Sequence, residues 1–329
     1  MSEREASAVK TESGGSANAG PPNVAAPLAG APRRRALVGG IKVLGLCAFV
    51  AFLLRRPELL EGAWQSLRTT NLAWWGASVA VLFFTLWINA LRTRAILRAG
   101  GFEIPLRSLY ADVIQAAGLN AVLLIGVDVL YRAERMRPVV GSFERGFAVA
   151  LLDRIFGFAA MFVAGLVGFV FLGTKLPFAF DGNKLAVLAA AGVVGVGVAA
   201  WLLPSRLRAL WDRIRPAVEP LFRDRRRFAE VAVLSFFTYA GAVLAVFCLS
   251  RGLAHPAPLL AYASVVPIVT VATVLPVTVG GIGIREAGYV TLLGAYGVAQ
   301  GPAIALGVTQ YATFLVAAAV GGLLFLRGR

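Results

Sequence analysis

A short stretch in the last quarter of the chain carries the residues best suited to chemistry. Residues 276–286 read Pro-Val-Thr-Val-Gly-Gly-Ile-Gly-Ile-Arg-Glu and interrupt an otherwise apolar run. In hydrocarbon, backbone N–H and C=O groups that leave a helix find no water, so such a segment must be packed in protein or line a wet cavity. Because Pro276, Gly280, Gly281 and Gly283 all loosen the backbone here, the pattern predicts the tip of a broken or re-entrant helix.

Arg285 and Glu286 close this stretch and supply its charge. An ionisable side chain at membrane depth costs about 2.5 to 3.5 kcal/mol on insertion scales and as a rule faces a pathway or a partner. A guanidinium binds phosphate through two parallel hydrogen bonds, so Arg285 suits a phosphate-bearing lipid headgroup. The alternative is a surface loop between two ordinary helices, with the charged pair among the headgroups.

Other polar residues inside apolar runs complete the candidate site. They are Asn120, Asp128, Arg132, Asp153 and Arg154. One hypothesis is a polar cavity that holds a lipid headgroup while the lipid tails stay in the bilayer. The other is a set of buried ion pairs that join helices and whose loss would destabilise the fold without any transport role. For Asn120, a hydrogen bond at a hairpin tip is favoured over contact with a ligand.

The composition identifies the class of protein that positions these residues. The chain has 329 residues, 58% of them hydrophobic and 15% charged, with a mean hydropathy of +0.76, which is too apolar for a soluble domain. The net charge of +15 comes from arginines at the ends of apolar runs, where positive-inside topology explains them better than nucleic-acid binding does. Cys47, Cys248 and His255 are too few for a metal centre or a disulfide scaffold, and no cofactor is expected.

The apolar runs predict an all-α polytopic membrane protein with six transmembrane helices and two re-entrant helical hairpins. Runs long enough to cross a bilayer lie at 36–54, 71–91, 146–173, 185–203, 230–249 and 302–326. The loop 204–228 holds eight arginines and should be cytoplasmic by the positive-inside rule. The loop 204–228 can be cytoplasmic only if residues 109–131 enter and leave the membrane on the same face, as a re-entrant hairpin. Residues 258–298 then form the second hairpin.

This topology makes both termini cytoplasmic in a multi-pass protein of the cell inner membrane. Residues 1–35 are expected to be a disordered tail, because their composition cannot bury enough apolar surface to offset the entropy of ordering. The transmembrane domain, 36–329, divides into halves at about 36–173 and 185–326, and three crossings per half make them an inverted repeat. Four arginines after the second crossing are assigned to a cytoplasmic loop: Arg92, Arg94, Arg98 and Arg107.

The pattern resembles the transmembrane region of lysylphosphatidylglycerol synthases and their stand-alone flippase-like relatives over about 36–326. The most specific element is 276–286, which is similar to that family's proline, glycine-pair, glycine, arginine-glutamate signature. Residues 94–101, 120–132 and 153–154 are weaker matches. The resemblance implies a flippase-like fold with two re-entrant hairpins and a role in moving or handling polar lipids.

The chain also departs from the family pattern. The first hairpin has no proline around Leu124, and Gln310 stands where relatives often have arginine. The chain ends at Arg329 without room for the soluble aminoacyl-transferase domain of the full synthases, so lysyl transfer is expected to be absent.

Two functions are consistent with these features. The first is a flippase or transporter that handles a polar or anionic phospholipid across the inner membrane, with membrane lipids as its partners. The alternative is a membrane-embedded partner or enzyme of a lipid or lipid-linked glycan modification pathway, working with a lipid-modifying enzyme. No His-rich, Cys-based or paired-carboxylate constellation indicates catalysis, so enzymatic activity is not expected.

Cysteine accessibility in intact cells tests the topology. Introduced cysteines near Met136 and Arg213 should be shielded from an impermeant external reagent, because both positions are predicted to be cytoplasmic. A cysteine near Gly182 should react. Labelling near Met136 from outside would remove the first hairpin from the topology.

Overall fold

The computed structural model describes residues 64–122, 126–172, 212, 215–216, 218–253, 257–274 and 281–327. Within these ranges the chain is helical and contains no strand, which confirms the all-α fold class. The main helices are α3 (Leu72–Ala99), α4 (Leu106–Val122), α5 (Val127–Val140), α6 (Phe143–Leu172), α9 (Arg225–Gly252), α10 (Leu259–Val274), α11 (Ile284–Gly294) and α12 (Gln300–Leu326).

Four of the described helices are long and apolar enough to cross a membrane. They are α3, the Phe143–Gly165 part of α6, α9 and α12. These correspond to the crossings predicted at 71–91, 146–173, 230–249 and 302–326. The predicted crossings at 36–54 and 185–203, and the tail at 1–35, lie outside the described residues.

Two crossing helices are longer than predicted. α3 continues through Arg92 to Ala99, so the assignment of Arg92 to a cytoplasmic loop was wrong: its side chain is buried inside the bundle. α9 begins at Arg225, because the Asp224 carboxylate accepts hydrogen bonds from the backbone N–H groups of Arg226 and Arg227 at 3.0 and 3.1 Å.

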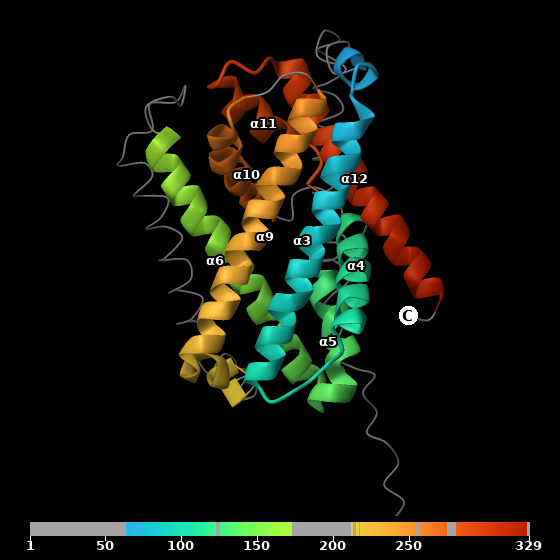
Figure 1. Ribbon diagram of the computed structural model, residues 1–329, viewed down its shortest axis with the longest axis vertical. Coiled ribbons are helices and arrows are strands. Elements are labelled where there is room, and N and C mark those ends of the chain that lie inside the picture. Colours follow the sequence, from blue (N-terminus) through green and yellow to red (C-terminus); the bar gives the residue numbers. More distant parts are fainter. Residues whose placement is uncertain are drawn as a thin grey trace, which may run out of the picture.

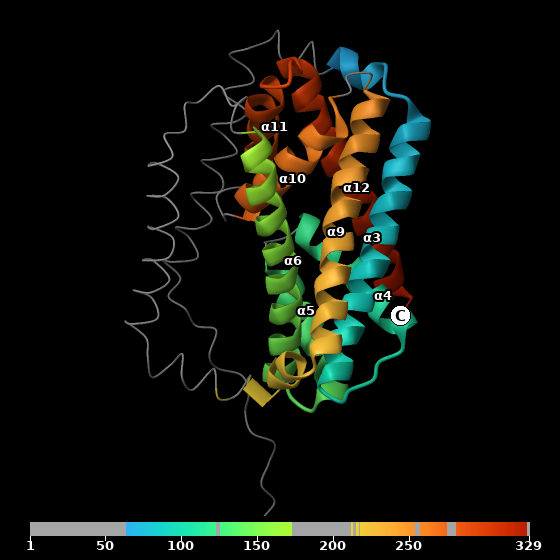
Figure 2. The ribbon, with the colours of Figure 1, turned by 60° about the vertical axis from the view of Figure 1, so that its left-hand side comes forward.

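Two pairs of short helices lie at opposite ends of the bundle (Figure 1). α4 and α5 occupy the end where α3 finishes and α6 begins, whereas α10 and α11 occupy the end where α9 finishes, and Figure 2 shows the same arrangement from another side. The break between α4 and α5 is at Gly126, whose φ of 101° is left-handed and favours glycine. The second helix of this pair reaches Val140, so Arg132 lies within it and not beyond a hairpin that ends at residue 131.

The contacts between helices follow a repeating scheme. α3 packs along α9, α4 packs on α12 as α10 packs on α6, and α5 packs on α6 as α11 packs on α12. The helices α3, α4, α5 and α6 correspond in order to α9, α10, α11 and α12. Every extensive contact between two described helices is matched by a contact between the corresponding two helices. The two sets of four helices therefore have equivalent neighbours. One hydrophobic core cluster is centred on each set, and the first cluster also includes Val231 of α9 and Ala317 of α12.

Glycines bring α4 and α12 into backbone contact. A Cβ atom at Gly321 would lie 2.9 Å from the carbonyl oxygen of Ile114, and one at Gly118 would lie 2.8 Å from the Cα atom of Ala318. Small residues that allow such close approach are typical of helix interfaces in membranes, where packing replaces the hydrophobic driving force.

Adjacent glycines in α12 provide a matched test of this interface. Gly321→Ala should destabilise the protein by about 1 to 3 kcal/mol, because the added methyl overpacks the contact with α4. Gly322→Ala should be neutral or slightly stabilising, since no atom lies within 4 Å of its added methyl and alanine favours helix. Thermal unfolding in detergent measures both. Equal effects of the two substitutions would show that α4 and α12 do not pack closely at Gly321.

Candidate functional site

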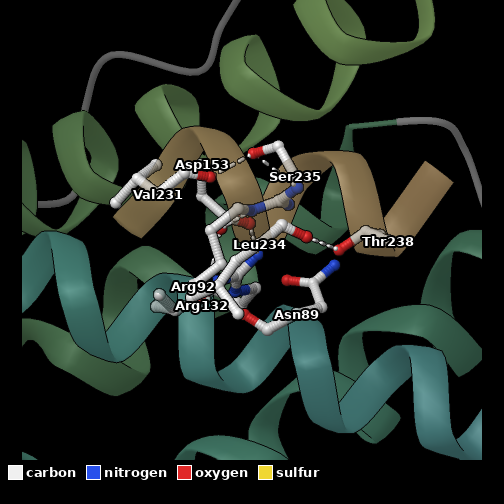
Figure 3. Close-up of polar contacts among 9 residues, drawn as sticks. Asn89, Arg92, Arg132, Asp153, Val231, Leu234, Ser235 and Thr238 are labelled. Atoms are coloured by element: carbon white, nitrogen blue, oxygen red, sulfur yellow. Dashed lines mark hydrogen bonds and ion pairs between the residues drawn. The ribbon is translucent and has the colours of Figure 1, made fainter. Parts of the chain in front are cut away.

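Asp153 in α6 is the centre of a buried ionic network (Figure 3). Its Oδ1 accepts a hydrogen bond from Arg92 Nε at 2.7 Å, and its Oδ2 accepts one from Arg132 Nη1 at 2.8 Å. Asp153 is 1% exposed, Arg92 3% and Arg132 8%. Because each carboxylate oxygen binds a different arginine, Asp153 joins α3, α5 and α6 at one point, and the three side chains together carry one net positive charge.

Hydroxyl groups extend the network to a fourth helix. Thr93 Oγ1 accepts a hydrogen bond from Arg132 Nη2 at 2.5 Å, and Arg92 Nη1 lies 3.5 Å from Ser235 Oγ on α9. Space for the Arg92 guanidinium comes from Gly157, one turn after Asp153, where a Cβ atom would lie 3.2 Å from Arg92 Nη1. The network therefore sits where the two halves of the bundle meet along α3 and α9.

Arg154 follows Asp153 in sequence but binds a different partner. Its Nη1 donates to Asp128 Oδ1 at 2.6 Å, and both side chains are about one-fifth exposed. Asp128 Oδ1 also accepts from the backbone N–H of Gly126 at 3.2 Å, so the carboxylate holds the break between α4 and α5. This half-buried pair ties the first pair of short helices to α6.

Arg285 and Glu286 lie in the first turn of α11, directly after a glycine turn. Gly281 and Gly283 have φ angles of 75° and 90°, which favour glycine. The Gly283 N–H donates to Glu286 Oε2 at 2.6 Å, so the buried carboxylate stabilises the turn. Pro276 and Gly280, the other predicted members of this stretch, lie outside the described residues.

Both charged residues of this turn pack onto α12. A Cβ atom at Gly307 would lie 2.8 Å from Glu286 Cγ, so only glycine leaves space for that side chain. The Arg285 guanidinium carbon lies 5.3 Å from the ring centroid of Phe314, a cation–π distance.

One turn of α12 also contacts the first pair of short helices. Tyr311 Oη donates to the carbonyl oxygen of Ala121 at 3.2 Å, while Gln310 Oε1 accepts from Tyr289 Oη of α11 at 2.8 Å. Asn120, next to Ala121, has a buried Oδ1 with no hydrogen-bond partner among the described residues. Residues 310–314 therefore connect α11, with its Arg285, to the end of α4.

Sequence reasoning paired neither Arg132 with Asp153 nor Asp128 with Arg154, and it missed other members of the network. Those members are Arg92, Thr93, Gly157 and Ser235. The sequence of α3 did indicate a buried polar face. Four of its polar residues recur at spacings of four, three and one, which place them on one side of the helix. They are Thr85, Asn89, Arg92 and Thr93.

The chain matches the family described as the lysylphosphatidylglycerol synthase TM region over residues 37–321. It belongs to this family. The resemblance based on residues 276–286 is thereby confirmed, and no curated protein gives a match. Membership of the lysylphosphatidylglycerol synthase TM family, together with the four apolar helices, indicates a multi-pass membrane protein that acts in lipid-related processes.

The ionic network can be tested by neutralising its centre. Asp153→Asn should destabilise the protein by about 3 to 5 kcal/mol, because two buried arginines would share no carboxylate. Glu103→Gln is the control: it breaks an exposed pair with Arg98 at 3.5 Å and should change little. Thermal unfolding in detergent compares them. An Asp153→Asn variant as stable as the control would mean that the network does not hold the helices together.

Proposed function

We propose that this protein binds the polar headgroup of an anionic or otherwise polar phospholipid between its two halves and moves it across the inner membrane. The observation that carries the proposal is the excess of arginine over carboxylate in the buried network, where Arg92 and Arg132 share Asp153. Buried charge is costly in a membrane and is as a rule functional. Arginine is also the side chain best suited to phosphate.

The arrangement of the helices supports a transporter architecture. α3 and α9 run in opposite directions in Figure 1, and the two pairs of short helices lie at opposite ends. The exchange of contacts between the two sets of four helices has the form expected for an inverted repeat. We infer that α4 with α5, and α10 with α11, are re-entrant hairpins that approach the centre of the membrane from opposite sides, the first from the cytoplasm.

Contacts on α12 give the two hairpins a common support. Arg285 packs on Phe314, and Tyr311 bonds to the end of α4 one turn away. A headgroup that displaced Arg285 from Phe314 would therefore disturb the helix on which the first hairpin rests. This is the kind of coupling that alternating access between two inverted halves requires.

The alternative prediction is that the protein is a membrane-embedded partner or enzyme of a lipid modification pathway. A transport assay separates the two, because a partner protein need not move lipid by itself. The assay also gives Arg285 its most direct test.

Variants of Arg285 test whether it handles headgroups. Arg285→Lys keeps the charge but loses the planar donor fork, so the flipping rate of a phosphate-bearing lipid in proteoliposomes should fall at least about tenfold, the value of one charge-assisted hydrogen bond. Arg285→Ala should lower the rate further, while the melting temperature of the lysine variant stays near that of the wild type. Arg98→Lys, at a partly exposed arginine of α3, is the matched control and should keep the rate.

The opposite outcome would assign the pair to the scaffold. In that case Arg285→Ala would lower the flipping rate only as far as it lowers stability. Combining it with Glu286→Ala would restore both, because removing both charges leaves no buried charge unpaired.

A further inference from the structure

A groove of about 610 Å³ runs between α6 and α9 and ends against α10. Its size is within the range of about 300 to 1,000 Å³ that small-molecule sites occupy. Apolar side chains such as Val163 and Ala232 form most of its wall. The hydroxyls of Ser235, Tyr239 and Ser264 also line it, but each donates to a backbone carbonyl. The groove therefore favours an apolar occupant.

The length of the groove matches one leaflet of a bilayer. On α9 its lining runs along one helix face from Phe228 to Tyr239. Eleven helical steps span about 16 Å. The hydrocarbon core of a bilayer is about 30 Å thick, so the groove is as long as the acyl-chain layer of a single leaflet.

One end of the groove is aromatic. The ring of Phe228 packs against those of Phe156 and Phe222, with centroid distances of 5.4 and 5.8 Å. Phe222 and Phe228 are exposed, and they adjoin the arginines that begin α9. Exposed rings beside arginines are typical of the boundary between hydrocarbon and headgroups. We therefore place this end at headgroup level.

Arg225 lies on the groove face of α9, one turn before the first aromatic side chain of the lining. Two nearby arginines have carboxylate partners: Arg223 binds Glu219 at 2.6 Å, an acid that also binds Arg215, and Arg227 binds Glu230 at 2.7 Å. Arg226 is exposed and has no ion-pair partner among the described residues, but as the next residue of the helix it points about 100° away from Arg225. Arg225 is exposed and forms no ion pair with any residue that the structure describes. Its charge is thus available at the headgroup end of an apolar groove.

We propose that the groove binds one acyl chain of an anionic phospholipid whose phosphate pairs with Arg225. Charge complementarity at one end and leaflet length along the wall both favour this occupant. Ser235 lines the groove and lies 3.5 Å from Arg92 Nη1, so the bound chain passes beside the buried ionic network. The inference goes beyond the proposed function, because a lipid can occupy this groove whether or not the protein moves it.

Photo-crosslinking of the full chain in lipid nanodiscs tests the proposal. A benzophenone amino acid at Ala232 points its reactive group along the groove, whereas the same group at exposed Val233 lies outside the lining and is the control. In nanodiscs that mix phosphatidylglycerol with phosphatidylcholine, the adduct at Ala232 should be enriched several-fold in phosphatidylglycerol, whereas exposed Val233 should capture both lipids in proportion to their abundance. Replacing phosphatidylglycerol with phosphatidylcholine should lower the adduct at Ala232.

Arginine variants test the headgroup contact in the same experiment. Arg225→Gln should lower the adduct at Ala232 about fivefold, the effect of one interfacial arginine on anionic lipid. Arg226→Gln should leave it nearly unchanged, because the next residue of the helix points about 100° away from the groove face.

Three results would overturn the proposal. They are an adduct between position 232 and the chain's own apolar segment 185–203, equal enrichment in phosphatidylglycerol at 232 and 233, and equal effects of the two arginine variants. None of them depends on transport. If the protein gives the expected adducts but does not flip lipid, the proposed function is wrong and the groove proposal stands. If it flips lipid but does not give the expected adducts, the groove proposal is wrong and the proposed function stands.

Discussion

The fold depends on one carboxylate shared between two arginines. Taking a single charge out of water costs several kcal/mol even after relaxation, and the attraction between partners offsets this only when the geometry is good and the remaining donors are bonded. Asp153 meets that condition with a different guanidinium on each oxygen. Since these arginines come from α3 and α5, the orientation of three helices follows from satisfying one side chain.

The two halves of the bundle share a contact scheme but differ in polar content. The first half contains the buried ionic network, whereas the second joins α11 to α12 partly through a neutral hydrogen bond from Tyr289 to Gln310. An arginine at position 310 could not accept that bond, because a guanidinium has no acceptor. Gln310 is therefore suited to its local partner, the Tyr289 hydroxyl. The first half thus buries two arginines around one carboxylate, whereas the second half buries Arg285 and Glu286 directly after a compact glycine turn.

The sequence predicted the helices far better than it predicted their contacts. Apolar runs located the crossing helices α6 and α12 to within about three residues, and the proline and glycines of 276–286 located the break between α10 and α11. Arg92 was assigned to a loop because hydropathy treats an arginine at the end of an apolar run as solvated. Its partner Asp153 is 61 residues away, and no local pattern specifies such a pairing. The polar face of α3 was the one signal that could have placed Arg92 inside.

The central claim is that buried arginines in this bundle serve a lipid headgroup as well as the fold. The most direct measurement is the flipping rate of fluorescent lipids by the wild-type chain in proteoliposomes, across headgroups of different charge. The account predicts faster transfer of anionic phosphate-bearing lipids than of neutral glycolipids, and faster transfer than in protein-free vesicles. Rates equal to those of protein-free vesicles for every headgroup would contradict it.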